Sequence, residues 1–389
     1  MKLSRDGYTI WMAQQPGIGQ YNLKEKRYTL HDPPLLKSKT VRQLEEDRFG
    51  NLWIGMQGIG LYKWSAREGS KRFADGVSKI TEIPDCSIGK IYEDSKGYIW
   101  VATSGYGVFV IDPTNDKILL TLPAIDKDGN YTSFLHVHHV MEYNDTTMIM
   151  SGGTSLHVFN RITKNIRTIG NENTIAGAVM SVEKDNESGY VWLSGTQGLY
   201  RANINNRIFV LFNRMDGISD DRFMLAASYK LPDGRMLFGA DNQFTVFRPR
   251  DVKINNMAPP VTITGFKVFD KYLLVDSLMR LNRVELTPKQ NSLTIEFSGL
   301  SYAGAYLIRY RLKGVDDDWK IADKNNQAVY TYLPPGDYQF MVKAEDADGK
   351  ESLHVTQMTI KIFPPVLANL VVLWSVVIVW SKHPLLDRS

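Results

Sequence analysis

The histidines in the stretch LHVHH, residues 135–139, are the side chains whose types and spacing best suit chemistry. His136 and His138 lie two residues apart, so in a strand they share one face and could chelate a metal ion. The sequence offers no third ligand at a suitable spacing, and its one cysteine, Cys86, excludes a cysteine-based metal site. We therefore predict no metal and no other cofactor, and we expect the histidines to be polar side chains that line the edge of a repeated β-sheet unit.

Two carboxylate runs, residues 45–47 (EED) and 93–94 (ED), could supply a general acid and a general base. A catalytic pair needs converging side chains with shifted pKa values. Both runs occupy the same place in a recurring pattern, which favours hairpin turns. The sequence lacks the G-x-S-x-G, H-E-x-x-H and P-loop motifs, and we expect no helix after the glycine-rich stretch at 151–155 to hold a phosphate. We predict no catalytic residues and no enzymatic activity for this chain.

The elements that hold these side chains are copies of one repeat. Residues 51–64 read NLWIGMQGIGLYKW, residues 99–112 read IWVATSGYGVFVID, and residues 191–203 read VWLSGTQGLYRAN. Another copy lies near the start of the sequence, and two weaker copies lack the tryptophan. The aligned positions are Trp11, Trp53, Trp100, Ile149, Trp192 and Leu237. A repeat of ~40–50 residues is typical of β-propeller blades.

Each copy predicts a blade of four antiparallel strands. In the copy at 41–64, VRQLEE alternates apolar and polar residues, as a half-buried strand does. Asp47 and Gly50 then form a turn, because Asp bonds its own backbone and Gly supplies a positive φ. NLWIG and LYKW are the second and third strands, and a fourth follows near 71–73. We expect the tryptophans to pack between neighbouring blades.

These residues resemble the regulator-propeller repeat in the periplasmic sensor region of Bacteroidetes-type hybrid two-component system histidine kinases. The family pattern is roughly I-x-E-D-x-x-G-x-L-W-I-G-T-x-x-G-L, and LEEDRFGNLWIGMQGIGL and IYEDSKGYIWVATSGYGV are similar to it. The unit at 216–249 is similar to the closing blade of that family, but it departs at Asn242 and Gln243, where a glycine is usual. The resemblance implies a ring of seven blades, of which six units are recognisable here.

The residue pattern changes after Pro259 and Pro260, where strand patterns alternate with turn residues over a shorter spacing. Such a pattern is typical of a small β-sandwich. The stretch from YRLKGVDDDWK to AVYTYLPPGDYQF resembles the three-tyrosine (Y_Y_Y) domain that follows the propeller in the same sensors. The matching positions are Tyr310, Trp319, Tyr330, Pro335, Gly336 and Tyr338. We expect these tyrosines to fill the sandwich core and pin its corner.

Composition and charge exclude other classes of protein. The 46 basic and 42 acidic residues give a net charge of +4, and the basic residues form no run longer than pairs such as Lys71-Arg72, so we predict no nucleic-acid partner.

The N-terminal segment MKLSRDGYTI is no signal peptide, because no apolar run follows its charges. It enters the repeat in the middle of a unit, and we expect the chain to be truncated at both ends.

Residues 366–380 (VLANLVVLWSVVIVW) carry no charge. Fifteen helical residues span ~22 Å, short of the ~30 Å hydrocarbon core, but the flanking residues extend the run to a minimal span. Trp380 and Lys382 would be its interfacial anchors. We predict a short C-terminal hydrophobic helix that crosses the membrane, and the alternative is a buried helix or a frayed tail.

The prediction is thus an all-β chain with two folded parts. A β-propeller occupies 1–255, and an immunoglobulin/fibronectin-like β-sandwich, the Y_Y_Y domain, occupies 259–364. The predicted membrane segment is 365–381, and 382–389 is a tail.

The resemblance implies a sensor that binds a carbohydrate-derived ligand outside the cytoplasm and transmits the signal through the sandwich to the membrane helix. It also implies a periplasmic location at the inner membrane, an oligosaccharide ligand and a homodimer formed through the sandwich. Relatives carry a histidine kinase whose sequence regions are absent here. The alternatives are a propeller lyase or glycosidase and a non-catalytic interaction scaffold. Ligand binding would use loops at one end of the propeller, where the candidates are Gln57, Tyr106, His136, Gln197 and Arg222.

Overall fold

The computed structural model describes residues 1–66, 76–171, 174–205, 207–218, 222–252, 258–300, 306–323, 325–346 and 349–365. The chain divides into two compact units, residues 1–254 and 255–389. The regular structure of the described residues is mainly β-strand, and their α-helix is the short α1 (Val275–Leu281) of the second unit. The all-β prediction is confirmed. The predicted hydrophobic helix at 366–380 lies outside the described residues.

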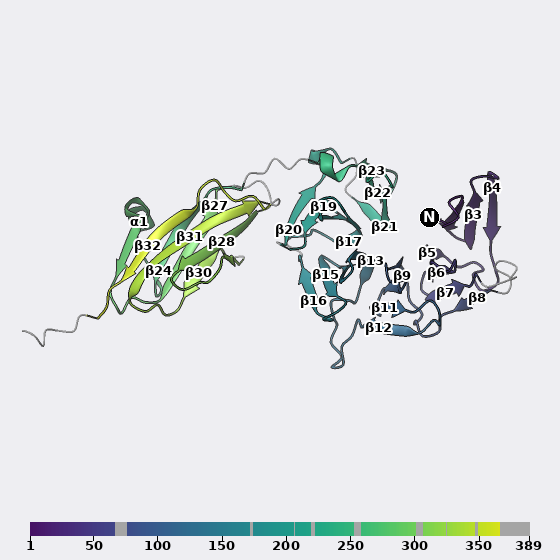
Figure 1. Cartoon of the computed structure of the whole chain (residues 1–389), viewed down its shortest axis with the longest axis horizontal. Coiled ribbons are helices and arrows are strands. Elements are labelled where there is room, and N and C mark those ends of the chain that lie inside the picture. Colours follow the sequence, from purple (N-terminus) through teal and green to yellow (C-terminus); the bar gives the residue numbers. More distant parts are fainter. Residues whose placement is uncertain are drawn as a thin grey trace, which may run out of the picture. The chain divides into compact units, whose positions relative to one another are not determined.

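The first unit is a series of antiparallel sheets in which each strand pairs with the next in the sequence (Figure 1). This up-and-down order is that of propeller blades. The first blade comprises β1 (Lys2–Leu3), β2 (Thr9–Ala13), β3 (Ile18–Asn22) and β4 (Arg27–His31). The second comprises β5 (Val41–Glu46), β6 (Leu52–Met56), β7 (Leu61–Trp64) and β8 (Val77–Lys79). The third comprises β9 (Ile88–Glu93), β10 (Ile99–Thr103), β11 (Val108–Ile111) and β12 (Ile118–Leu122).

The next three sheets continue the same order. The fourth comprises β13 (Val137–Asn144), β14 (Thr147–Gly152), β15 (Ser155–Asn160) and β16 (Ile166–Ile169). The fifth comprises β17 (Val179–Lys184), β18 (Val191–Gly195), β19 (Gly198–Asn203) and β20 (Ile208–Phe212). The sixth comprises β21 (Phe223–Lys230), β22 (Met236–Ala240) and β23 (Phe244–Phe247). The six predicted units are therefore six sheets. The sixth departs from the four-strand pattern among the described residues, because the chain turns at Pro249 into a 3-10 helix, Pro249–Asp251, after β23.

The turns between the first and second strands are built on aspartates. Asp47 Oδ1 accepts hydrogen bonds from the backbone N–H groups of Phe49 and Asn51, at 3.0 and 2.9 Å. Its Oδ2 accepts from Trp53 Nε1 at 2.8 Å. The third blade repeats this arrangement with Asp94 and Trp100, also at 2.8 Å. The interpretation of the carboxylate runs as turns is therefore confirmed, and the aspartate also fixes the repeat tryptophan.

The tryptophans pack between neighbouring blades, as predicted. Trp53 of the second blade is fully buried in a cluster with Ile88 and Ile99 of the third. Glycine allows the innermost strands of neighbouring blades to approach each other closely. A Cβ on Gly89 would lie 2.7 Å from the carbonyl oxygen of Val137 in the next blade, so a larger residue would push the two blades apart.

The second unit is a β-sandwich of two sheets with β24 and β27 in one and β28, β31 and β32 in the other (Figure 1). Its pairs are antiparallel except β26 with β32, which is parallel. The strands are β24 (Val261–Val268), β25 (Lys271–Tyr272), β26 (Arg283–Leu286), β27 (Leu293–Gly299), β28 (Tyr306–Lys313), β29 (Lys320–Ile321), β30 (Gln327–Tyr330), β31 (Gly336–Asp346) and β32 (Thr356–Ile362).

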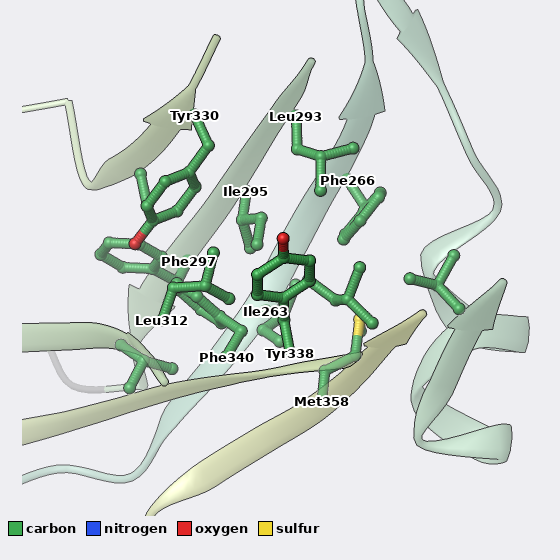
Figure 2. Close-up of a cluster of buried hydrophobic side chains, with 14 of the residues drawn as sticks. Ile263, Phe266, Leu293, Ile295, Phe297, Leu312, Tyr330, Tyr338, Phe340 and Met358 are labelled. Carbon is green, nitrogen blue, oxygen red and sulfur yellow. The ribbon is translucent and has the colours of Figure 1, made fainter. Parts of the chain in front are cut away.

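The sandwich core includes the tyrosines of the three-tyrosine pattern. Figure 2 shows Tyr330 and Tyr338 among the buried apolar side chains of both sheets. The Tyr330 hydroxyl donates to Asp316 Oδ2, and the Tyr338 hydroxyl donates to the Pro334 carbonyl oxygen, each at 2.7 Å. Tyr310 stacks on Phe340 at 6.2 Å between ring centroids. The expectation that these tyrosines fill the core and pin its corner is confirmed.

Candidate functional site

The five loop residues proposed from the sequence lie at one end of the propeller and are all exposed. Gln57, Tyr106 and Gln197 lie on the turns between second and third strands, and His136 and Arg222 directly precede the first strands β13 and β21. Because the strands alternate in direction, these turns and connections share the same end of the unit.

Two of these loops are brought together. Ser104, two residues before Tyr106, bridges to His136, and its hydroxyl lies 3.3 Å from His136 Nδ1. The backbone N–H of Gly105 donates to the carbonyl of Leu135 at 2.7 Å. The Gln57 side-chain oxygen accepts from Arg42 Nε of its own blade at 3.4 Å, and the next residue, Gly58, donates its N–H to the Ser87 hydroxyl at 3.1 Å, just before β9. The structure therefore joins Tyr106 and His136 in one patch and ties the turn of Gln57 to the start of the third blade.

His136 and His138 do not act as a pair. His136 precedes β13, and His138 Nδ1 lies 3.0 Å from the carbonyl oxygen of Val179 in the next blade. No group of three or more potential metal-binding side chains occurs among the described residues. The third histidine of the stretch, His139, is buried and lines a cavity.

A cavity of about 390 Å³ lies between the innermost strands of the third to sixth blades. These strands, β9, β13, β17 and β21, lie around the centre of the unit (Figure 1). Asn144 and Asn186 contribute to its wall, so the cavity lies toward the end where first and second strands are joined. That end is opposite the five predicted loop residues. The charged and imidazole side chains of its wall are Lys90, His139, Glu142, Glu183, Lys184 and Lys230.

β-Bulges precede Lys90 and His139, two polar side chains of the cavity wall. The pairing of first and second strands shifts at the same place in the second to fifth blades. The residues that follow the shift are Gln43, Lys90, His139 and Ser181. A bulge bends the strand and re-aims the next side chain, and bulges are over-represented next to functional sites.

Lys90 is the central charge of the cavity. Burial lowers the pKa of its ammonium group, and the carboxylates of Glu183 and Glu45 oppose that shift. The ammonium group of Lys90 forms neither a hydrogen bond nor an ion pair with any described residue. The two carboxylates have partners of their own: Glu45 pairs with Lys2, and Glu183 accepts from the Ser228 hydroxyl at 2.8 Å. Burial raises the pKa of both Glu45 and Glu183, opposed by these partners.

His139 is almost completely buried, with 2% of its surface exposed, and neither ring nitrogen has a hydrogen-bonding partner among the described residues. Burial lowers its pKa well below the usual value, and the charge of Lys90 lowers it further. The ring is therefore neutral at physiological pH. A neutral imidazole has one N–H donor and one acceptor nitrogen, and both are unused here.

Sequence reasoning missed this cavity. A usable signal was present, because Lys90 and His139 are polar residues at matched positions in the first strands of two blades. Charged and imidazole side chains are seldom buried without a purpose, so a polar residue that recurs at one position can mark a site.

Two family models match the chain. The two component regulator propeller matches residues 82–105, and the Y_Y_Y domain matches residues 300–363. The first match covers the turn and tryptophan of the third blade, and the second covers the three tyrosines of the sandwich. The regulator-propeller repeat and the Y_Y_Y domain are thus the two module types of this chain.

Solved structures and a curated relative agree with this class. The extracellular domain of BT3049 of B. thetaiotaomicron, assigned to the hybrid two component systems, matches with a TM-score of 0.57 and 21% identity over 93% of this chain and 50% of that chain. The corresponding domain of BT4673 of the same organism gives 0.51 and 17% over 94% and 50%. Histidine kinase P4 of Formosa agariphila is 22% identical over 368 residues, 90% of this chain and 26% of that protein.

The chain therefore has the architecture of a sensor region of hybrid two-component systems, with regulator-propeller repeats followed by a Y_Y_Y domain. It spans about half the length of the solved extracellular domains and about a quarter of the curated kinase. Among the described residues, no helix has the length and apolar character needed to cross a membrane.

Proposed function

We propose that this chain is the extracytoplasmic sensor region of a two-component signalling protein and binds a carbohydrate-derived ligand. The observation that carries the proposal is the order of the modules, a regulator propeller followed by a Y_Y_Y sandwich. The curated relative, which 90% of this chain matches, is named a histidine kinase. The propeller is then the ligand-binding module and the sandwich its connection to the membrane.

The sandwich is suited to transmit a movement because its core is pinned by buried polar contacts. Asp316 Oδ2 accepts from the Tyr330 hydroxyl and from the backbone N–H of Leu312, both at 2.7 Å. Thus β28, β30 and the turn that carries Asp316 are held together. A ligand drives signalling only through its different affinity for two arrangements of the protein. We propose that a homodimer formed through the sandwich provides these arrangements and that residues 366–380 anchor it.

The loop patch around Tyr106 and His136 is the proposed saccharide contact. Tyr106 is 47% exposed and offers an aromatic face, and Gln57, Gln197 and Arg222 offer amide and guanidinium donors at the same end of the unit. Aromatic rings and planar donors suit stacking on and hydrogen bonding to a sugar.

Calorimetric titration of the full chain with a panel of plant and host oligosaccharides tests the proposal. We expect saturable binding without turnover, weakened about tenfold by Tyr106→Ala and by Arg222→Ala. Tyr131→Ala is the control, because Tyr131 is 73% exposed on the loop between β12 and β13 and is not a proposed contact.

Other outcomes would contradict the proposal in different ways. Turnover of an oligosaccharide would show a propeller lyase or glycosidase. An identified ligand whose affinity is unchanged in both loop variants would place its site elsewhere. A folded protein that binds no saccharide would favour an interaction scaffold.

A further inference from the structure

The cavity at the centre of the propeller contains polar groups that the fold does not use. Both ring nitrogens of the buried His139 are unpaired in the described part of the chain, and the half-buried side chain of Lys90 forms no hydrogen bond or ion pair there. A buried polar group without a partner costs about 1–3 kcal/mol. A propeller that needed His139 only for packing would be more stable with an apolar residue in its place.

The charges of the wall favour an anion. Three lysines, Lys90, Lys184 and Lys230, line the cavity with two glutamates, Glu142 and Glu183. Glu142 is neutralised by Arg161 Nη2 at 2.6 Å. Lys184 and Lys230 donate to backbone carbonyl oxygens, so their charges have no acidic partner in those contacts. The wall therefore presents more positive than negative charge.

Glu183 limits where an anion can bind in this wall. Its carboxylate faces the cavity and is held by Ser228. A negatively charged group is therefore best placed next to Lys90 and away from Glu183. The volume of about 390 Å³ lies within the range of roughly 300–1,000 Å³ typical of small-molecule sites.

We propose that this cavity binds a ligand through a carboxylate group placed on Lys90, with His139 as the neutral hydrogen-bonding side chain of the wall. The imidazole N–H can donate to the second carboxylate oxygen once the ring turns toward the cavity, and Lys90 supplies a charge-assisted bond to the first. The ligand is an acidic sugar or a small organic acid. This inference rests on the proposed sensor function only in taking the propeller as the ligand-binding module.

The test is calorimetric titration of the full chain with glucuronate, lactate and glucose. We expect saturable binding of glucuronate and none of glucose. Lactate binding as tight as glucuronate binding would support the site with an organic acid as its ligand. A preference for glucuronate would support it with an acidic sugar. No binding of either acid would overturn it.

Variants assign the binding to this cavity. We expect Lys90→Met to weaken acid binding at least about tenfold, because a charge-assisted hydrogen bond is lost. Lys96→Met is the matched control on the exposed turn of the same blade and should bind as the parent does. Thermal unfolding checks that the variants are folded, and Lys90→Gln replaces Lys90→Met should the latter not fold. Unchanged acid binding in either folded Lys90 variant would overturn the inference.

The same variants separate this inference from the sensor proposal. A neutral oligosaccharide that binds the parent and Lys90→Met equally, with no binding of either acid, would overturn the cavity assignment and leave the sensor proposal standing. Lactate binding that depends on Lys90, without binding of any saccharide, would support the cavity and contradict a carbohydrate ligand.

Discussion

Asp94 and Arg161 form an ion pair of 2.8 Å that joins the third and fourth blades of the propeller, with 0% and 7% of their side chains exposed. Asp94 sits in the turn after β9, and Arg161 directly follows β15. The same carboxylate oxygen accepts from Trp100 Nε1. Arg161 also pairs with Glu142 at 2.6 Å. One buried aspartate therefore fixes a turn, the repeat tryptophan and the next blade.

Asp94→Ala should destabilise the propeller by about 3–5 kcal/mol, because it leaves a buried guanidinium without one of its partners. Asp126→Ala is the matched control, since Asp126 makes the same kind of turn, accepting from the N–H groups of Asp128 and Asn130 at 2.9 Å, but is exposed. We expect it to cost about 1 kcal/mol or less. Urea unfolding measures both, and equal losses would show that the link between blades contributes nothing.

Tyr330→Phe should lower the stability of the sandwich by about 1–2 kcal/mol, because Asp316 loses a buried donor while the ring still packs. Tyr332→Phe, at a tyrosine that is 69% exposed two residues later, should stay within about 0.5 kcal/mol of the parent. Thermal unfolding of the full chain reports both. A Tyr330 variant as stable as the Tyr332 variant would mean that this hydroxyl serves no structural purpose.

Two neighbouring glycines should respond differently to the same substitution. Gly105 and Gly107 have φ values of +92° and +91°, but a Cβ meets nothing within 4 Å at Gly105 and lies 2.0 Å from the Leu122 carbonyl oxygen at Gly107. Gly105→Ala should cost roughly 1–2 kcal/mol for its positive φ alone. Gly107→Ala adds a backbone clash and should cost clearly more. Denaturant unfolding of the two variants would refute this explanation if their losses were equal.

His157 should make the propeller less stable in acid. Burial lowers its pKa from 6.5 to about 4, so the unfolded state takes up a proton first as the pH falls. Stability from the neutral ring is present above pH ~6.5 and is lost as the pH falls toward ~4, by about 3 kcal/mol in total. His157→Gln should remove this loss. Urea unfolding at pH 7 and pH 4.5 compares the two proteins, and parallel losses in both would contradict the assignment to His157.

The strands and turns of the blades could be predicted from the sequence wherever the repeat is clear. The repeat that contains Trp53 and Trp100, each preceded by a turn with Asp and Gly, correctly predicted the turns, the strand order and the packing of the tryptophans between blades. The divergent fourth unit is equally regular in the structure, because Ile149 fills the tryptophan position in the next core cluster. Helix α1 was missed, since seven residues give too short a period to detect.

The candidate site was only partly readable. The positions of Gln57, Tyr106 and Gln197 on the turns between second and third strands followed from the repeat. The contact between Ser104 and His136, which joins two loops into one patch, could not be predicted from the repeat. It depends on how the start of the fourth blade packs against a turn of the third.

The sequence by itself therefore determined the six repeat units, their turns and the presence of a sandwich after them, because these follow from short-range periodicity. Only the tertiary structure decided that Lys90, His139 and Glu183 share one cavity. These residues come from three blades, and their side chains meet only when successive sheets turn about a common centre. The repeat puts Lys90 and His139 at matched positions, but it does not show which side chains of other blades lie next to them, so the cavity and its unpaired groups are properties of the folded propeller.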